Sequence, residues 1–447
     1  MARIGVGTRR TRHGHPAGAA RLLCQSPDSK FAHPASSRES PTARMFAIFA
    51  APLLSDNAFT MIAAAASLPG VRLGVITHDP ASKLRHLEGQ VAHWRVDNIL
   101  DVNQLRWAAT ELQARNGRIH RLYGAYEQLQ EALAEVRESL GVDGMSVETA
   151  VNFRDKARMK TVMRANGVPC ARHRLAANIA EALAFAATSG FPVVVKPPAG
   201  AGAQQTYRVE NPDQLQRALS AQPPSATTPV LLEEFILGEE HSLETISVDG
   251  NAVWHSLTRY RPTPLQVMEN PWIQWCLVLP REVDDPRYDD IRAAARKALT
   301  ALGMRTGLSH MEWFRRADGS IAISEVAARP PGAQITTLIA RAHDIDFLWA
   351  WSQLMIFNTF EAPQRKYAAG AAYLRGQGRG RVVGIHGWDR IQRDLGDLIT
   401  DVKLPAMGAT PSTSYEGEGY IIVRHPDTAV VERAVSRIVS TVRVELG

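Results

Sequence analysis

Two glutamates, Glu312 and Glu325, have the residue type and spacing that most strongly predict chemistry. They lie in two strand candidates separated by Ala317-Asp318-Gly319-Ser320, and Asp-Gly is a strong signal for a tight hairpin turn. With Asp318 and Gly319 at the centre of that turn, Glu312 lies opposite Glu325, and their Cβ atoms are about 5 Å apart on one face. A four-residue loop gives the same pairing, whereas a three-residue loop puts the glutamates on opposite faces. The strand candidates are Met311–Arg315 and Ile321–Val326.

Two ionised carboxylates this close repel each other by about 4 kcal/mol at an effective dielectric constant near 20. Protonation, a basic partner or a bridging divalent cation can offset that repulsion. Paired carboxylates suit Mg²⁺, which takes one or two of them together with substrate phosphates. Arg329 follows Glu325 by four residues, and a guanidinium beside a metal site suits a phosphate or a carboxylate. A surface hairpin with two solvated acids is the alternative.

Lysines and a loop of small residues precede this hairpin in the sequence. Lys156 and Lys160 lie on one face of a helix candidate, Arg154–Asn166, where a solvated basic face is the simple interpretation. Lys196 ends a buried strand candidate, Phe191–Lys196, and Pro197-Pro198 stop the strand. The small residues that follow, 199–204, could bring backbone N–H groups close to phosphates, although a plain linker has the same composition.

The elements that must position these residues fall into two groups along the chain. Strands alternate with helices in the first 100 residues after Met45, which predicts a small parallel α/β unit. No G-x-G-x-x-G follows the first strand, so dinucleotide binding is not supported. Later strands and a helix at the end predict a mixed lobe. The expected elements are strands at 46–51, 71–77, 118–123, 230–236, 241–248, 368–374, 381–385 and 419–423 and helices at 58–68, 102–113, 126–140, 289–302, 335–357 and 429–442.

Length, charge and cysteine content bound the class of protein. A chain of 447 residues predicts two or three domains. No run of 18 apolar residues occurs, so no membrane span is predicted. The three cysteines, Cys24, Cys170 and Cys276, form no metal-binding spacing and fit unpaired thiols in a cytoplasmic protein.

The first 44 residues account for the basic character of the chain. They hold eight basic and two acidic residues, which equals the whole net charge of +6, so the remainder is balanced. The remainder therefore lacks the global basic character that nucleic-acid binding favours. The segment is rich in Arg, Ser and Pro and predicts a disordered leader, with translation proper expected at Met45 and a transit peptide as the lesser option.

The order of these parts resembles the ATP-grasp superfamily, specifically its carboxylate–amine ligase branch. The resemblance covers nearly everything from Met45 onwards and is most specific from Arg154-Asp155-Lys156 to Gly332. It implies an α/β fold with α+β ATP-grasp lobes. The implied parts are a leader at 1–44, a pre-ATP-grasp α/β domain at 45–150, a two-lobed ATP-grasp domain at 151–362 and a small C-terminal α+β lobe at 363–447.

The resemblance also implies roles for particular residues. Lys160 and Lys196 match the lysines that reach the nucleotide phosphates, and Arg329 matches the basic residue at the acyl-phosphate centre. Glu312 and Glu325 match the metal ligands, but the family often reads E-x-N-x-R where this chain has Ala327, so one ligand is missing. Lys196 and Arg329 are the expected catalytic residues. The other implied nucleotide contacts are Gly200, Gly202 and Gln204 in the phosphate loop, Glu233, Glu234, Phe235 and Ile236 at the adenine, and Glu240 at the ribose.

The implied function is an ADP-forming ligase that uses ATP and Mg²⁺, or Mn²⁺, to join a carboxylate to an amine through an acyl phosphate. An amino-acid or dipeptide ligase is the first expectation. An enzyme of the biotin-carboxylase or purine-pathway type that uses bicarbonate or formate, and a nucleotide-binding protein without catalysis, stay open. The expected partners are ATP and small substrates, without nucleic acid or membrane, and a homodimer stays open.

Two further expectations concern the surroundings of the site. His310 is close to Glu312 in the sequence, and we expect its side chain to face the other way and to be structural. Residues 268–273 and Trp275 could line a substrate pocket, and core or exposed positions explain these aromatic residues equally well.

Overall fold

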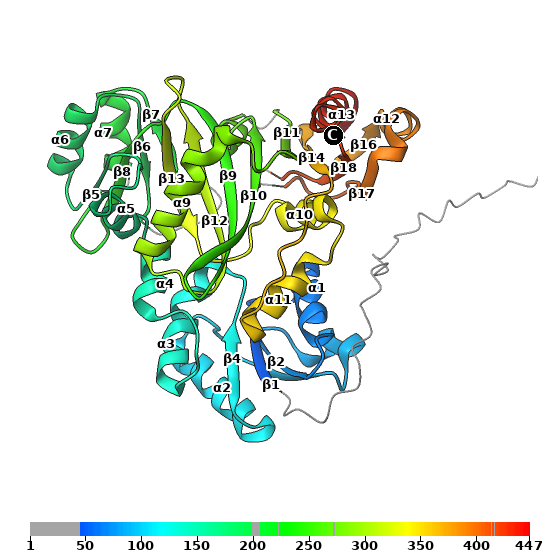
Figure 1. Ribbon diagram of the computed structural model, residues 1–447. Coiled ribbons are helices and arrows are strands. Elements are labelled where there is room, and N and C mark those ends of the chain that lie inside the picture. Colours follow the sequence, from blue (N-terminus) through cyan, green and yellow to red (C-terminus); the bar gives the residue numbers. More distant parts are fainter. Residues whose placement is uncertain (1–44, 199–205, 222, 271–272, 413, 415) are drawn as a thin grey trace, which may run out of the picture. The chain divides into compact units, whose positions relative to one another are not determined.

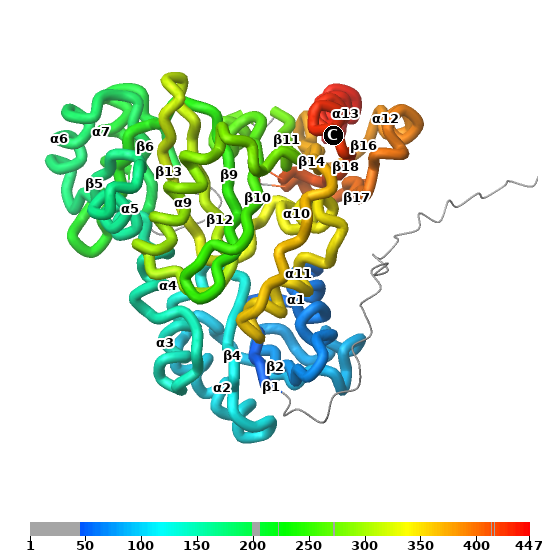
Figure 2. The backbone as a smooth tube through the Cα atoms, in the orientation of Figure 1, coloured from blue at the N-terminus to red at the C-terminus, as the bar shows by residue number. Residues whose placement is uncertain are grey.

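The computed structural model describes residues 45–447 apart from 199–205, 222, 271–272, 413 and 415. The predicted leader and the predicted phosphate loop with Gly200, Gly202 and Gln204 therefore lie outside the described residues. Residues 41–447 form one compact unit, in which all the elements described here lie (Figures 1 and 2).

A four-stranded parallel sheet opens the described chain, in the order β3-β2-β1-β4. Its central strand β1 is almost wholly buried, as expected for a parallel sheet covered on both faces. The predicted parallel α/β unit is thus present, and β3 is a strand that the sequence analysis missed. The elements are β1 (Met45–Ala50), α1 (Asp56–Ala66), β2 (Val71–Thr77), β3 (Val91–Arg95), α2 (Val102–Asn116), β4 (Ile119–Tyr123), the short helix η2 (Glu127–Leu129) and α3 (Gln130–Leu140).

A second four-stranded sheet is antiparallel, in the order β5-β8-β6-β7. Its strand β6 ends at Lys196, as predicted. Alanines and leucines of α6 and α7 pack against valines of this sheet in one buried cluster. The bounds are β5 (His173–Ala176), α6 (Ile179–Ser189), β6 (Val193–Lys196), β7 (Tyr207–Val209), α7 (Pro212–Ala221) and β8 (Val230–Glu234).

The largest sheet is antiparallel and has eight strands, in the order β13-β12-β9-β10-β11-β14-β18-β17. Strand β11 pairs with β14, so backbone pairing continues across the predicted domain boundary at residue 362. The strands are β9 (Glu239–Val248), β10 (Asn251–Arg261), β11 (Trp275–Leu279), β12 (Gly307–Arg315), β13 (Ile321–Ala327), β14 (Ala368–Leu374), β17 (Ile399–Lys403) and β18 (Gly419–His425).

The remaining elements surround these three sheets. Helix α9 packs its apolar face against β12 and β13, and α13 packs against β11, β14 and β18. Among the described residues, none of the helices has the length and the apolar run that crossing a membrane requires. The bounds are α4 (Val147–Arg154), α5 (Lys156–Ala165), α8 (Pro264–Glu269), α9 (Asp289–Leu302), α12 (Trp388–Leu395) and α13 (Thr428–Thr441), with short helices η1 (Ala81–Leu87), η3 (Pro286–Tyr288) and η4 (Gly396–Leu398) and a small sheet of β15 (Gly376–Gly378), β16 (Val382–His386) and β19 (Arg443–Leu446).

The single long helix predicted at 335–357 is wrong. The structure has two helices, α10 (Ile335–His343) and α11 (Phe347–Phe357). Asp344 ends α10 with a left-handed φ of 61°, and the Asp346 side chain then accepts a hydrogen bond from the Trp349 backbone N–H to begin α11. Aspartate is one of the few residues that tolerate the left-handed region and one of the best N-caps.

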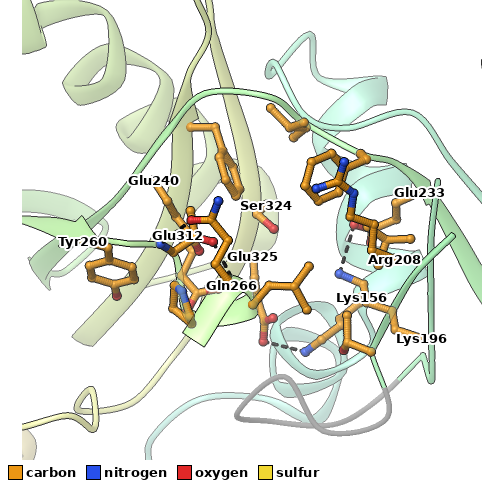
Figure 3. Close-up of a pocket in the computed structure, with 18 of the residues that line it drawn as sticks. Lys156, Lys196, Arg208, Glu233, Glu240, Tyr260, Gln266, Glu312, Ser324 and Glu325 are labelled. Atoms are coloured by element: carbon orange, nitrogen blue, oxygen red, sulfur yellow. Dashed lines mark hydrogen bonds and ion pairs between the residues drawn. The ribbon is translucent and has the colours of Figure 1, made fainter. Parts of the chain in front are cut away.

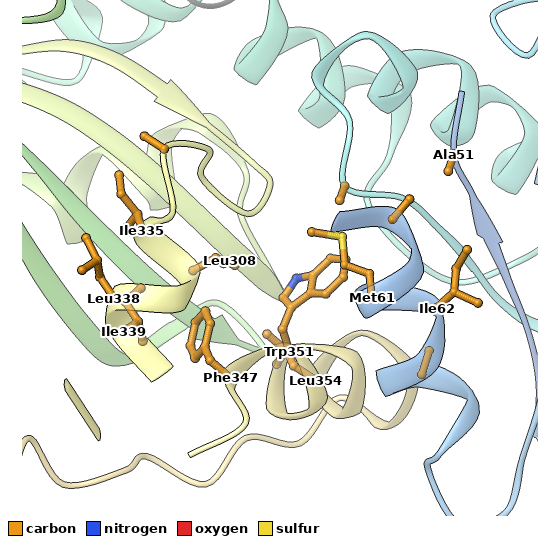
Figure 4. Close-up of a cluster of buried hydrophobic side chains, with 14 of the residues drawn as sticks. Ala51, Met61, Ile62, Leu308, Ile335, Leu338, Ile339, Phe347, Trp351 and Leu354 are labelled. Atoms are coloured by element: carbon orange, nitrogen blue, oxygen red, sulfur yellow. The ribbon is translucent and has the colours of Figure 1, made fainter. Parts of the chain in front are cut away.

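An apolar cluster joins the parallel sheet to the large sheet through α11 (Figure 4). The Trp351 ring lies 6.5 Å from the Phe49 ring and 5.7 Å from the Tyr123 ring, measured between centroids. Trp351 is 2% exposed. The cluster therefore fixes the parallel α/β unit against the sheet that carries the two glutamates.

Candidate active site

One cavity gathers residues from the second and the largest sheets (Figure 3). Strands β6 and β8 contribute Lys196 and Glu233, and β12 and β13 contribute Glu312 and Glu325. Three stretches that were predicted separately therefore line one cavity. They are the strand that ends at Lys196, the predicted adenine strand and the carboxylate hairpin. The other lining residues of the cavity include Glu234, Phe235, Ile236, Glu240, Ala327 and Arg329.

The two glutamates lie opposite each other on the hairpin, as predicted. The predicted turn is wrong, however, because Arg316 and Ser320 close a three-residue loop through hydrogen bonds from Arg316 N to Ser320 O and from Gly319 N to Arg316 O. The pairing shifts by one residue between Glu312 and Trp313. This bulge makes Ser324 the extra residue on β13, and the extra residue restores the pairing that the odd loop would have removed.

Glu325 is held by a lysine that the sequence analysis left on a basic helix face. Lys156 Nζ lies 2.5 Å from Glu325 Oε1. Burial alone would raise the pKa of Glu325, but the charges of Lys156 and Lys196 lower this pKa to about 2. Glu325 is therefore ionised at neutral pH and ready to act as an oxygen ligand.

Glu233 lies between two lysines at the back of the cavity. Its Oε1 is 3.1 Å from Lys160 Nζ and its Oε2 is 2.9 Å from Lys196 Nζ. Burial would raise the pKa of Glu233, and the two ammonium groups lower it below its usual range. Burial would likewise lower the pKa of Lys196, but Glu233 and Glu325 raise it, so Lys196 is a charged group on the cavity wall.

Lys160 is fully buried and also donates a hydrogen bond to the Ser324 carbonyl oxygen. Burial lowers its pKa. It is not among the cavity's lining residues, whereas Lys156 is. The structure therefore places Lys156, one turn earlier on α5, where a phosphate could be met, and the role predicted for Lys160 stays a prediction. Asp155 begins α5 just before Lys156, because its side chain accepts hydrogen bonds from Ala157 N and Arg158 N.

The expected orientation of His310 is wrong. His310 and Glu312 are two residues apart on β12, so their side chains share one face. His310 lines the cavity; its Nδ1 is 2.8 Å from Glu244 Oε1 and its Nε2 is 3.7 Å from Glu312 Oε1. Burial would lower the pKa of His310, but hydrogen bonds to Glu244 and Glu312 raise it to about 9.

Glu240 and Tyr260 form the wall on the other side of Glu312. Glu240 is 8% exposed. Burial and then the charge of Glu312 raise the pKa of Glu240 well above its usual range. Burial also raises the pKa of Tyr260 well above its usual range.

Arg329 lines the cavity and is held from the parallel α/β unit. Its Nε donates to Glu127 Oε2 at 2.7 Å, and Arg154 Nη1 is 3.8 Å from the other oxygen of the same carboxylate. Glu127 is 7% exposed and belongs to η2, just after β4. The predicted acyl-phosphate arginine is thus oriented by a residue that no sequence signal marked.

The predicted adenine segment lines the cavity beside a residue that was also missed. Arg208 on β7 places its guanidinium 4.2 Å from the centre of the Phe235 ring, and both line the cavity. Glu234 is bound by Arg172 at 2.7 Å and Arg316 at 3.1 Å. Its side chain is therefore engaged by protein groups, which leaves the backbone of this segment as the edge that could read a base.

One end of the cavity contains Trp275, which is a core residue and also lines the cavity. The ring is 1% exposed, stacks on Tyr373 with centroids 4.8 Å apart, and lines the cavity. Residues 271–272 of the neighbouring predicted pocket segment lie outside the described residues. Gln266 and Glu269 on α8 complete this end.

The donor set around the glutamates fits a magnesium ion that also binds phosphates. Among the described residues, no group of three or more His, Cys, Asp or Glu side chains is placed to hold a metal by itself. Mg²⁺ usually needs only one or two carboxylates, with phosphates and waters completing its shell. Glu312 and Glu325, paired across the strands, supply that number.

These features define a class of protein. A cavity lies between two antiparallel sheets, with lysines on one side and a carboxylate hairpin on the other, and this arrangement is that of an ATP-grasp protein. Residues 189–338 match the ATP-grasp domain family. This part of the chain is therefore an ATP-grasp domain. The predicted family and fold class are confirmed.

Comparisons with individual proteins agree with this assignment. The chain is 25% identical over 282 residues to the L-arginine-specific L-amino acid ligase of Bacillus subtilis, which covers 61% of this chain and 66% of that ligase, a little under two thirds of its length. An L-amino acid ligase of Bacillus licheniformis superposes with a TM-score of 0.70, at 18% identity and over 91% of this chain and 100% of that one. N5-carboxyaminoimidazole ribonucleotide synthetase of Thermotoga maritima gives a TM-score of 0.66, at 17% identity and over 90% and 100% of the two chains.

Proposed function

We propose that this protein joins a carboxylate to an amine at the expense of ATP, with Mg²⁺, and releases ADP and phosphate. The observation that carries the proposal is the meeting of Glu312, Glu325, Lys156, Lys196 and Arg329 at one cavity. The similarity to amino acid ligases supports an amino acid as the acyl donor. Carboxylates, ammonium groups and a guanidinium together are what phosphoryl transfer needs for charge neutralisation.

In the first step, an oxygen of the substrate carboxylate attacks the γ-phosphorus, and the bond to the β-phosphate oxygen breaks to release ADP. Lys156 and Lys196 would hold the phosphate oxygens, and Glu312 and Glu325 would hold the Mg²⁺. When bound, the ion neutralises the β- and γ-oxygens. Lys156 can leave Glu325 for a phosphate oxygen, because both groups would then keep an opposite charge as partner.

In the second step, the amine nitrogen attacks the acyl carbon, the bond to phosphate breaks, and the nitrogen loses a proton to solvent. Negative charge develops on the acyl oxygen during this attack. Arg329, held by Glu127 at 2.7 Å, would stabilise that oxygen and the departing phosphate. A guanidinium fixed before the reaction needs no reorganisation during it.

A screen of phosphate release from Mg·ATP tests the proposal. Single amino acids and pairs, bicarbonate and formate are supplied in separate arms, and hydroxylamine in a further set traps any acyl phosphate as a hydroxamate. We expect release to require an amino acid and the hydroxamate to form. Stimulation by bicarbonate or formate alone would favour the carboxylating and formate-using enzymes that share the fold, and no stimulation by any carboxylate would favour nucleotide binding without catalysis.

A further inference from the structure

A second cavity of about 590 Å³ lies beside the candidate active site. Its floor holds His241, Arg259 and Tyr288, whose side chains are largely buried. Its rim holds Arg261 and Arg287, whose side chains are 59% and 55% exposed. A volume of this size falls within the range of about 300–1,000 Å³ that is usual for small-molecule pockets.

Guanidinium groups dominate the lining. Arg315 joins Arg259, Arg261 and Arg287, so four arginines line the cavity. One carboxylate, Glu432, serves both Arg259 at 2.8 Å and Arg261 at 3.3 Å. The other two arginines have aspartate partners, Asp285 for Arg287 at 3.3 Å and Asp290 for Arg315. Four guanidinium groups therefore share three carboxylates that lie outside the lining, while the lining itself also contains the carboxylates of Glu239 and Glu240.

The floor of the cavity contains a buried histidine, His241, beside the arginines. His241 stacks on Trp313 with ring centroids 4.6 Å apart. Burial, followed by the charges of Arg259, Arg315 and Arg261, lowers the pKa of His241 to about 3. Burial disfavours a charge of either sign at this point, whereas the three arginines disfavour positive charge alone, so it is the arginines that would attract an anion.

Donors on the rim are available for a ligand. The hydrogen bond recorded for Arg261 uses only Nη2, to Glu432, and Arg287 lies over the Tyr288 ring at 5.1 Å with Asp285 beside its Nε. The planar fork of a guanidinium binds carboxylate or phosphate oxygens in pairs. Both rim arginines therefore offer guanidinium donors of the kind that bind such an anion.

We propose that this cavity is a binding site for a small organic anion that carries a phosphate or carboxylate group. Gly238, Glu240, Tyr260, Thr263 and Gln266 line both this cavity and the candidate active site. An anion bound here would contact the residues that form the wall of the nucleotide cavity. Its binding should consequently change nucleotide affinity, and nucleotide should change the affinity for the anion by the same factor.

Isothermal titration of the full chain with inorganic phosphate and with succinate tests the site, and neutral succinamide is the uncharged probe. Four proteins are compared: the unmodified chain, the double variant Arg261→Gln with Arg287→Gln, the control Arg305→Gln, and Lys196→Ala. Arg305 has a side chain that is 81% exposed and lies outside the cavity. Thermal melts establish that each variant is folded.

We expect at least one anion to bind the unmodified chain, the Arg305→Gln control and Lys196→Ala with similar affinity, and succinamide not to bind. The double variant should bind about tenfold more weakly or worse, because two charge-assisted contacts are lost. Binding that disappears in Lys196→Ala and persists in the double variant would assign the anion to the nucleotide cavity and overturn the proposal. Equal weakening in Arg305→Gln would also overturn it. So would the absence of binding of either anion to the unmodified chain at concentrations up to about 20 mM.

Discussion

At the scale of single residues, the site is a set of opposite charges that neutralise one another before any substrate arrives. Lys156 faces Glu325, Lys196 and Lys160 face Glu233, and Arg329 faces Glu127. Such pairs keep buried charges ionised, since an unpaired charge in the same place would be costly to bury. In each pair, one residue could bind substrate while its partner holds it in position.

The first prediction concerns the carboxylate pair. Glu325→Gln should abolish Mg-dependent turnover and weaken Mg·ATP binding, because an amide is a poor ligand for Mg²⁺ and leaves Lys156 without its partner. Steady-state kinetics across Mg²⁺ concentrations, with calorimetry of a non-hydrolysable ATP analogue, measure both effects. Glu135→Gln, an exposed glutamate on α3, is the control. An unchanged Mg²⁺ dependence in Glu325→Gln would rule out the two-carboxylate site.

The second prediction separates two residues on opposite sides of the glutamates. Lys196→Ala should weaken ATP binding about tenfold or more, since charge-assisted phosphate contacts are worth about 1.5–3 kcal/mol each. Arg329→Ala should keep ATP affinity within a few-fold and lower kcat about a hundredfold, as for a group that acts on the transition state. Loss of nucleotide binding in Arg329→Ala, with turnover kept per bound ATP, would contradict the acyl-phosphate role.

The third prediction separates the two lysines of α5. Lys156→Ala should lower ATP affinity as well as stability, because Lys156 lies on the cavity wall and is also the ion-pair partner of Glu325. Lys160→Ala should mainly lower stability, by about 3 kcal/mol, because it removes one partner from a buried ion pair. Thermal melts and calorimetry of the ATP analogue distinguish the two. The opposite pattern would show that Lys160, as the family resemblance implies, is the phosphate ligand.

At the scale of elements, the parts that were predictable from sequence are those that depend on local pattern. Strand β6 ends at Lys196 and the Glu312–Glu325 pairing is present, because buried runs and turn residues carry both signals. The bulge at Ser324 was not predictable, because it depends on the burial of β13 and on Lys160 binding the Ser324 carbonyl. Residues brought in by tertiary contact, such as Glu127 and Arg208, lack any local signal.

The fourth prediction concerns η2, the short helix that brings Glu127 to Arg329. Glu127→Gln should lower kcat about tenfold to a hundredfold, because a small misplacement of a positioned group has that effect, and should leave ATP affinity within a few-fold. If Glu127 had a purely structural role, kcat would fall only in proportion to the folded fraction. Thermal melts and active-site titration measure that fraction. Glu135→Gln again serves as the control. Equal kcat in Glu127→Gln and the control would contradict the positioning role.

At the scale of the whole described unit, the division into domains is less sharp than the sequence suggested. One eight-stranded sheet runs from the carboxylate hairpin to the C-terminal strands, and one apolar cluster crosses from the parallel sheet to α11. The sequence resolves neither feature, because both are made by contacts between distant segments. The domain limits at 150 and 362 accordingly stay predictions.

The fifth prediction tests that cluster. Trp351→Ala should lower the free energy of unfolding by about 3–5 kcal/mol, the usual cost of removing a buried tryptophan, because the ring packs on Phe49 and Tyr123 of the parallel sheet in a cluster that also contains residues of the large sheet. The folded fraction should keep its ATP affinity, since Trp351 is not a lining residue of the cavity. Trp107→Ala is the matched control, with a ring 56% exposed. Equal shifts in melting temperature for both variants would show that the cluster does not join the two parts.

The bulge at Ser324 has a consequence for how this chain can change over generations. Beyond the bulge the hairpin tip contains only three residue pairs, from Trp313 with Ile323 to Arg315 with Ile321. Strand β12 is paired with β9 along its whole length, from Gly307 with Ser247 to Arg315 with Glu239, so a change of pairing at the tip falls on the edge strand β13. A change in the strand pairing at the tip can thus absorb an insertion or deletion there. Related sequences can therefore differ in loop length while Glu312 and Glu325 stay paired on the same face of the hairpin.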